Sequence, residues 1–169
     1  MIYSPHMSAE QNRDLYFAGP LFSQAEKTFN QQLAHRLERE LGVTVFLPQR
    51  DGMEFVKLQE MSPKERTAAI SELDTIKVFG SGIFLYVLDG RVPDEGAAFE
   101  LGLAYTHKLF TEEGKSRIIV GLLTDVRAFL PDQQLNPMLD YPFEYIAHSE
   151  EELLNYLKER LTPKPSHTE

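Results

Sequence analysis

The chain has 169 residues, enough for one domain that buries roughly 70% of the surface its unfolded form exposes. Its composition, 42% hydrophobic and 25% charged, is that of an ordinary globular protein. The formal net charge is −9, from 17 Lys and Arg against 26 Asp and Glu. This balance argues against a nucleic acid polymer as the ligand, because phosphate backbones bind basic surfaces.

Other ligand classes are excluded by residue type. Cysteine is absent, so disulfides, thiolate catalysis and cysteine metal sites are ruled out. The five histidines are scattered without metal-ligand spacing, and we expect neither a metal nor a cofactor. No run approaches about 18 consecutive apolar residues and no signal-peptide core is present, so we expect no membrane association and a cytoplasmic protein.

The chain divides into three parts. We expect one domain over residues 14–162, preceded by an N-terminal extension (1–13) and followed by a loose C-terminal tail (163–169). Within the domain, short apolar runs alternate with helical stretches. In chain order, strands are predicted over residues 14–20, 43–51, 82–90, 117–125 and 143–149.

Helices are predicted between and after these strands, over residues 23–42, 62–79, 93–105 and 149–161, with a short helical piece at 54–59. Three of them open with a capping box, in which a serine and a glutamate three residues later bind each other's backbone amides. The pairs are Ser23 with Glu26, Ser62 with Glu65, and Ser149 with Glu152. Gly42 is the predicted end of the first helix.

Alternation of strand and helix, with central strands that are apolar throughout, predicts an α/β fold. We expect a flavodoxin-like, doubly wound parallel sheet of about five strands in a single domain. Ligands of such sheets bind at the carboxyl ends of the strands, near the point where the strand order reverses. The residues around the ends of the first four strands are therefore the candidates for a site.

Acidic, polar and small side chains gather at these positions. The candidates are Tyr16, Gly19, Gln49, Asp74, Asp89, Asp94, Gly96 and Glu100. Tyr16 lies inside the first strand, and Gly19 after it allows a close approach of the backbone. Asp74 lies on the helix before the third strand. Several carboxylates that converge in one pocket are the groups that glycosyl chemistry uses.

Most of these residues also have a structural interpretation. Asp94 would cap the helix that follows it and face the positive end of that helix. Asp74 would pair with Lys77, three residues further on. Tyr16 would be a core aromatic with a hydrogen-bonded hydroxyl, and Asp89 would belong to an Asp-Gly turn.

Glu100 is harder to explain structurally. In the predicted helix over 93–105 its neighbours on one face are small or apolar: Gly96, Ala97, Leu103 and Ala104. A carboxylate in such surroundings is costly unless it is paired or functional. Gly96, with Ala97 and Ala98, would leave open space beside the start of this helix.

Four blocks of sequence, taken in order, resemble the nucleoside 2-deoxyribosyltransferases. They are "YFAGPLFS", "LPQRDG", "DGRVPDEGAAFELGLAY" and "LNPML", and the resemblance runs from residue 14 to about 140. The third block is the most specific, an Asp-Gly turn followed by Asp-x-Gly-x-x-x-Glu-x-Gly. Relatives often carry Ser or Thr where this chain has Ala97, a departure that bears on substrate preference.

The resemblance implies roles for individual residues. Glu100 matches the family's nucleophile, and Tyr16 matches the tyrosine that orients it. Asp94 matches an acid that contacts the nucleobase, and Asp74 matches a further acid on the preceding helix. Either acid would protonate the leaving base.

Two further matches concern substrate binding. Gln49 falls where the family places a base-contacting side chain. Asn136, in "LNPML", matches an asparagine that reaches into a neighbouring subunit's site to hold the sugar. The resemblance therefore implies a homo-oligomer, at least a dimer.

The activity implied is transfer of the 2-deoxyribosyl group between nucleobases, with deoxynucleosides and free nucleobases as substrates. Two displacements through a deoxyribosyl ester of Glu100 would retain the configuration at C1′. A related alternative is a 2′-deoxynucleoside 5′-monophosphate N-glycosidase, which needs a phosphate cradle; "GPLFSQAEK" offers Ser23 but no arginine. An alternative from a different functional class is a non-catalytic nucleotide-sensing module. A receiver-type signalling domain ranks last among the alternatives.

Overall fold

The computed structural model describes residues 12–126 and 135–162. The expected C-terminal tail lies outside these residues, as does all but the end of the expected N-terminal extension. Within the described residues, no helix is both long and apolar enough to cross a membrane.

A sheet of five parallel strands forms the centre of the molecule, in the order β2-β1-β3-β4-β5. The strands are β1 (Asp14–Ala18), β2 (Thr44–Phe46), β3 (Ile83–Val87), β4 (Ile118–Leu122) and β5 (Tyr145–Ala147). The chain steps from β1 to β2 in one direction and then to β3 on the other side of β1, so the strand order reverses at β1 and β3. The predicted flavodoxin-like sheet is confirmed.

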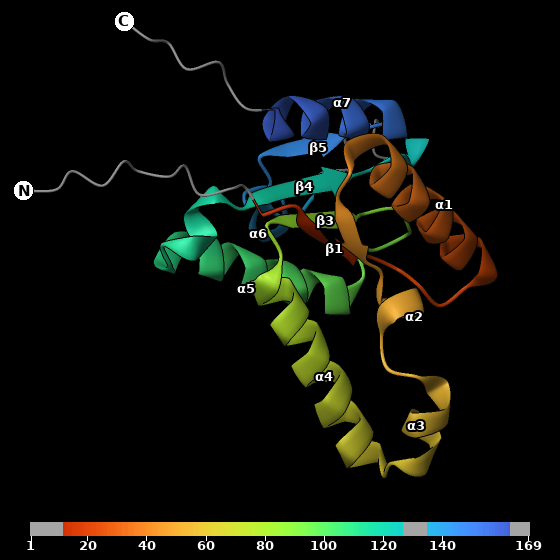
Figure 1. The fold of residues 1–169 in the computed structure, drawn as a ribbon. Helices are drawn as coiled ribbons and strands as arrows, with labels where there is room; N and C mark the ends of the chain where they lie inside the picture. Colours follow the sequence, from red (N-terminus) through yellow and green to blue (C-terminus); the bar gives the residue numbers. More distant parts are fainter. Residues whose placement is uncertain (1–11, 127–134, 163–169) are drawn as a thin grey trace, which may run out of the picture.

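Helices cover both faces of this sheet. They are α1 (Gln24–Leu41), α2 (Pro48–Asp51), α3 (Phe55–Glu60), α4 (Pro63–Gly80), α5 (Glu95–Phe110), α6 (Pro137–Asp140) and α7 (Glu150–Leu161), with a 3-10 turn at Glu113–Ser116. Figure 1 shows α1 and α7 on one face, α4 and α5 on the other, and α3 with the start of α4 projecting from the body. One hydrophobic core lies under α1 and α7, and a second lies under α4 and α5.

The second core is rich in aromatic side chains from adjacent strands. The ring of Tyr16 stacks on Phe84 at 5.8 Å and on Phe46 at 5.5 Å between centroids. Tyr16, Phe84 and Tyr86 are all fully buried. Two tyrosine hydroxyls thus point from the sheet toward α5, and each needs a hydrogen-bond partner.

Two of the three predicted capping boxes are complete, those of α1 and α4. The third is wrong in one half. Ser149 accepts from the Glu152 amide at 3.2 Å, but the Glu152 carboxylate accepts from the His148 amide at 2.8 Å. The backbone of Ser149 is more extended (φ −153°) than in the other two caps, and this presents the preceding amide instead.

The predicted strand over 43–51 is wrong in its second half. β2 ends at Phe46, and Pro48 begins the short helix α2. Proline has no N–H to donate to a sheet and suits the first position of a helix. The Asp51 carboxylate then accepts from the Leu47 amide at 2.8 Å. The helix predicted to end at residue 105 continues to Phe110, because no glycine or proline stops it earlier.

Gly42, at the end of α1, allows a test of backbone strain. It has a left-handed φ of 63°, and a β-carbon added there would meet nothing within 4 Å, so Gly42→Ala strains only the backbone. We expect the free energy of unfolding to fall by about 1 kcal/mol, measured by urea denaturation. In the matched variant Gly102→Ala, within α5 and equally unobstructed, we expect a rise of up to about 1 kcal/mol. A Gly42→Ala protein as stable as the wild type would contradict the left-handed backbone conformation at Gly42.

Candidate active site

A cavity of about 370 Å³ opens between the carboxyl end of β1 and the start of α5, the helix that follows β3, near the point where the strand order reverses. This volume is in the range of small-molecule sites. Its apolar wall comes from the end of β1 and the segment after it, from the segment after β2, and from α3 and α4. Its acidic side comes from α4 and the start of α5. The lining residues are Phe17, Ala18, Gly19, Leu21, Phe22, Pro48, Gly52, Met53, Leu58, Ile70, Leu73, Asp74, Asp94, Gly96, Ala97 and Glu100.

A hydrogen bond beside this cavity joins β1 to α5. The Tyr16 hydroxyl donates to Oε1 of Glu100 at 2.7 Å, across 84 residues of sequence. Burial, followed by the neighbouring Glu100 carboxylate, raises the pKa of the Tyr16 phenol, so the hydroxyl keeps its proton and acts as the donor. Glu100 is thereby held in one orientation, with the cavity beside it.

The Glu100 carboxyl titrates close to neutral pH. Burial raises its pKa to about 7, and the nearby carboxylates of Asp74 and Asp94 contribute in the same direction. The hydrogen bond from Tyr16 opposes the shift by stabilising the anion. A carboxyl with a pKa near neutrality, in a cavity beside other titratable groups, is typical of a catalytic position.

Asp74 lies on α4 and lines the same cavity. Burial raises the pKa of its carboxyl. Among the described residues no group donates a hydrogen bond to it, and the expected structural pair with Lys77 does not form. The Lys77 ammonium lies instead over the ring of Phe46, 5.3 Å from its centroid. Asp74 is thus a partly buried acid that lines the cavity and has no partner among the described residues.

Asp94 both caps the N-terminus of α5 and lines the cavity. Its Oδ1 accepts from the Ala97 amide at 2.9 Å, so the predicted capping role is confirmed. The fixed cap leaves the carboxylate at the edge of the cavity, one to two helical turns before Glu100. Contact with a nucleobase stays a prediction.

Both candidate glycines line the cavity. Gly19 has a φ of 145°, and a side chain there would meet the Cβ and carbonyl oxygen of Val87 at 3.0 Å. A side chain at Gly96 would lie 3.2 Å from Oδ1 of Asp94. Glycine at these two positions keeps the backbone close to neighbouring groups and leaves the cavity open.

Gln49 and Asp89 lie outside the cavity lining and have partners within the protein. The Gln49 amide accepts from Asn30 at 3.2 Å and donates to the carbonyl of Lys27 at 2.7 Å, which ties α2 to α1. The Asp89 carboxylate accepts from the amide and hydroxyl of Thr124, each at 2.6 Å, and joins the ends of β3 and β4. Their substrate-binding roles stay predictions.

Asn136 also lies outside the lining of this cavity. It caps α6, with Oδ1 accepting from the Met138 amide at 2.9 Å, and its side chain is exposed. The residue therefore forms no part of the cavity wall of its own chain. Its role in a neighbouring subunit's site stays a prediction.

Tyr86 is a residue of this region that the sequence analysis missed. It lies on β3, and its hydroxyl donates to the backbone carbonyl of Asp94 at 2.6 Å. The signal was a hydroxyl-bearing side chain inside an otherwise apolar strand, where a buried hydroxyl needs a hydrogen-bond partner. The apolar wall of the cavity, including Met53 and Ile70, was also missed, because no local pattern links α3 and α4 to the strand ends.

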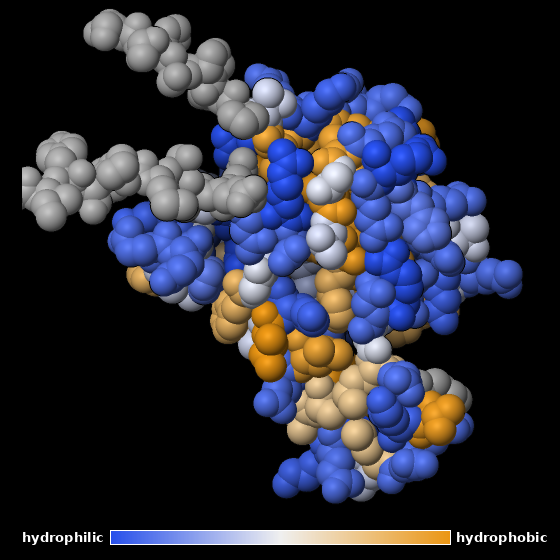
Figure 2. All heavy atoms as spheres, viewed as in Figure 1, coloured by the Kyte–Doolittle hydropathy of each residue, from blue (hydrophilic) through white to orange (hydrophobic). Residues whose placement is uncertain are grey.

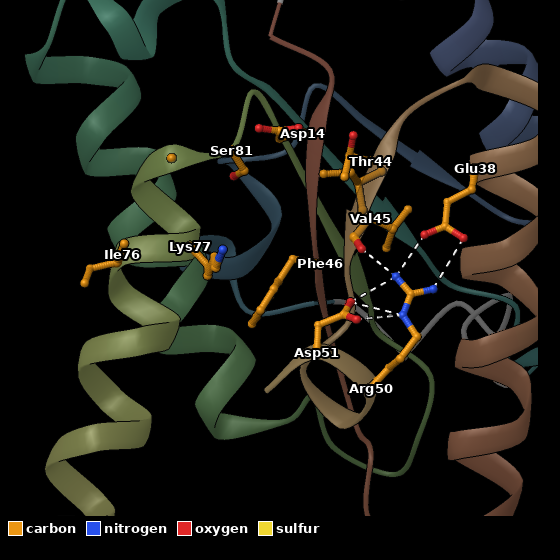
Figure 3. A pocket seen from close by; sticks show the side chains of 12 residues that line it. Asp14, Glu38, Thr44, Val45, Phe46, Arg50, Asp51, Ile76, Lys77 and Ser81 are labelled. Carbon is orange, nitrogen blue, oxygen red and sulfur yellow. Dashed lines mark hydrogen bonds and ion pairs between the residues drawn. The ribbon is translucent and has the colours of Figure 1, made fainter. Parts of the chain in front are cut away.

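A second cavity, of about 520 Å³, runs along the outer edge of β2 between α1 and α4. Figure 3 shows that the charged side chains of this cavity bind one another. The Arg50 guanidinium donates hydrogen bonds to Glu38, Asp51 and the carbonyl of Val45. The guanidinium and the two carboxylates thus pair with one another and cover the edge of β2. The "LPQRDG" block is therefore structural in its Arg50 and Asp51, and we place the candidate active site in the first cavity.

The acidic side chains of the cavity do not form a metal-binding cluster. Across residues 12–126 and 135–162, no three His, Asp or Glu side chains are grouped so that they could hold a metal ion.

Comparison with known proteins identifies the family. The family model described as nucleoside 2-deoxyribosyltransferase matches residues 15–157. The chain belongs to this family, whose members act on nucleosides. No curated protein matches the sequence.

Solved structures agree with the fold. A conserved protein from Enterococcus faecalis V583 is 28% identical with a TM-score of 0.73, and the match covers 89% of this chain and 99% of that one. A 2-deoxyribosyltransferase from Bacillus psychrosaccharolyticus is 20% identical with a TM-score of 0.67, covering 90% and 98%. A CMP N-glycosidase from Clostridium botulinum is more distant, 18% identical with a TM-score of 0.48, covering 86% and 98%.

The raised pKa of Glu100 has a consequence for stability. Its folded-state pKa of about 7 lies above the ordinary 4.5, so the folded protein binds this proton more tightly than the unfolded chain. The stabilisation by protonated Glu100 is complete below pH 4.5 and is lost as the pH rises through 7.

We therefore expect Glu100→Gln to be more stable than the wild type by roughly 1–3 kcal/mol at pH 8, and by much less at pH 5. Urea denaturation at the two pH values measures this difference. Glu95→Gln, an exposed position on the same helix, is the control and should change little at either pH. An equal change in the free energy of unfolding at both pH values would contradict the raised pKa of Glu100.

Proposed function

We propose that the protein transfers 2-deoxyribosyl groups between nucleobases through a covalent ester of Glu100. The observation that carries this proposal is the 2.7 Å hydrogen bond from Tyr16 to Glu100 in a cavity that two further acids line. Membership of the nucleoside 2-deoxyribosyltransferase family supports it. Tyr16 aims the carboxylate, and the apolar wall keeps bulk water from the reacting centre.

The reaction has two displacements at C1′. In the first, a Glu100 carboxylate oxygen forms a bond to C1′ of a 2′-deoxynucleoside while the bond from C1′ to the base nitrogen breaks. The electron pair goes to the base, which takes a proton from an acid in the cavity. In the second, a nitrogen of another base attacks C1′ from the opposite face, the ester bond breaks and the carboxylate is restored. The proton that this nitrogen loses passes to the acid that was deprotonated in the first step, which returns the site to its starting state. Two inversions retain the original configuration.

The two acids differ in their surroundings, and this suggests their roles. The carboxyl of Asp74 has a pKa raised by burial and no hydrogen-bond donor among the described residues, so it is suited to hold and deliver the proton. One oxygen of Asp94 is occupied by the Ala97 amide. We assign proton donation to Asp74 and contact with the base to Asp94.

The cavity favours a nucleoside over a nucleotide. None of the described residues that line it is Lys or Arg, whereas three are acidic: Asp74, Asp94 and Glu100. A 5′-phosphate would meet these carboxylates without a compensating cation. This charge pattern favours base exchange over the alternative of a deoxynucleoside monophosphate N-glycosidase.

Removing the nucleophile tests the proposal. Incubation of deoxyinosine or thymidine with a second free base, followed by chromatography, should show exchanged nucleoside with the wild type. We expect Glu100→Ala to lose this activity by roughly 10³-fold or more while retaining its fold by circular dichroism. A 2′-fluorinated nucleoside should add its sugar mass to the wild type and not to the variant.

The control for this experiment is Glu95→Ala, an exposed acid of the same helix outside the cavity lining, which should keep wild-type exchange. An active Glu100→Ala protein would overturn the nucleophile assignment. Release of base without exchange would favour the N-glycosidase alternative, and binding without either reaction would favour the sensing module.

We further propose that a second copy of the chain completes the site with Asn136. Its exposed side chain lies outside the cavity of its own chain, and α6 and the residue after it also expose Met138 and Tyr141, at 81% and 78%. Apolar side chains are exposed elsewhere too, among them Ile76 and Phe79 of α4. Figure 2 shows hydrophobic residues at the surface where α4 leaves the body. Surface of this kind is typical of contacts between protein chains.

Mixing two defective chains tests the shared site. We expect Asn136→Ala to weaken substrate binding and Glu100→Ala to be inactive. In a dimer mixed in equal amounts, half of the molecules carry both chains and one of their two sites is intact, so about a quarter of the wild-type sites should return. Exchange rates at low substrate concentration measure the recovery. No recovery, or a monomer by native mass spectrometry, would show that each chain works alone.

A further inference from the structure

Tyr86 is anchored to the N-terminal cap of α5. Its side chain is fully buried on β3, and its hydroxyl donates to the carbonyl oxygen of Asp94 at 2.6 Å. Burial, with the carboxylates of Asp94 and Glu100 next in effect, raises the pKa of the phenol, so it remains a donor. The contact joins the centre of the sheet to the residue that caps α5.

Tyr86 and Tyr16 form a pair of anchors on neighbouring strands. In the register of β1 and β3, Tyr16 lies opposite Phe84 and Tyr86 lies opposite Ala18, so Tyr86 is two residues, or about 7 Å, nearer the carboxyl edge. α5 returns antiparallel to the strands and starts at that edge. The outer tyrosine therefore meets the helix start, and the inner one meets Glu100, six residues or about 9 Å further along the helix.

Two hydrogen bonds at different heights fix both the position of α5 along its axis and its rotation about that axis. The local contacts of Asp94 do neither, because its carbonyl accepts from the Ala98 amide at 2.9 Å and its Oδ1 from the Ala97 amide at 2.9 Å, both within the helix. The Tyr86 hydroxyl joins Asp94 to the sheet through a hydrogen bond. It determines where the Asp94 carboxylate stands relative to the cavity.

We propose that Tyr86 is a positioning residue for base exchange, which acts by holding Asp94 against the cavity while Tyr16 independently holds Glu100. The proposal rests on the proposed function of the site. Tyr86→Phe removes the hydroxyl and keeps the ring and its contact with Phe143, at 6.3 Å between centroids. The Asp94 carbonyl keeps the Ala98 amide as a partner, so the variant should fold.

A double-mutant comparison separates positioning from general stability. We expect Tyr86→Phe alone to lower kcat/KM for exchange by roughly 10- to 100-fold, as a misplaced group does. In an Asp94→Asn background, where asparagine still caps the helix, the same change should cost less than about 2-fold. In a Tyr16→Phe background, Tyr86→Phe should again lower kcat/KM by roughly 10-fold or more, because Tyr16 acts through a different residue, Glu100.

A structural control and a readout independent of activity complete the test. Phe143→Leu alters the packing of Tyr86 and leaves its hydroxyl, so it should cost much less activity than Tyr86→Phe. Hydrogen exchange of the Ala97 and Ala98 amides should quicken in Tyr86→Phe while that of the β3 amides stays unchanged. The hydrogen-exchange measurement does not depend on enzyme activity. If the wild type failed to exchange nucleobases, the proposed function would be overturned, but this measurement would still test whether Tyr86 holds the start of α5.

Three results would overturn the positioning role. They are wild-type kcat/KM in Tyr86→Phe, the same loss in the Asp94→Asn and Tyr16→Phe backgrounds, and unchanged exchange of the amides at the start of α5.

Discussion

A single hydrogen bond between the sheet and the helix α5 organises this molecule, from the Tyr16 hydroxyl to the Glu100 carboxylate at 2.7 Å. Placing a carboxylate in a partly apolar cavity is unfavourable, and this cost appears as a pKa raised to about 7. The hydroxyl offsets part of that cost and fixes the direction of the carboxylate. It can do so because Tyr16 is itself rigid, stacked between Phe46 and Phe84. The reactivity proposed for Glu100 depends on this rigidity.

The topology of the sheet supplies the remaining parts of the site. The reversal of strand order at β1 and β3 places α4 and α5 on one face, so that Asp74 and Asp94 reach the same cavity from different helices. The two acids are not equivalent, because Asp94 is held by an amide of its own helix while Asp74 is not held by any described donor. A difference in environment of this kind separates the roles of chemically similar groups.

Regions that resemble the family in sequence serve different purposes in the structure. Asp94, Gly96 and Glu100 of the third block line the cavity. Arg50 of the second block closes the edge of β2, and its neighbours there are acids rather than substrate groups. The four blocks taken together therefore indicated the family, but they did not by themselves separate residues that line the cavity from residues that support it.

Much of the fold follows from local sequence, because hydrophobic periodicity, capping serines and buried strands are read over short distances. The same local reasoning found Glu100, from its apolar helical neighbours, and the cap at Asp94. It could not decide which side chains meet, since Tyr16 and Glu100 are 84 residues apart and their contact depends on strand order and register. Only the tertiary structure identified the hydrogen-bond partner of Tyr86. A buried hydroxyl needs an acceptor, and the packing of α5 on the sheet decides that this acceptor is the carbonyl of Asp94.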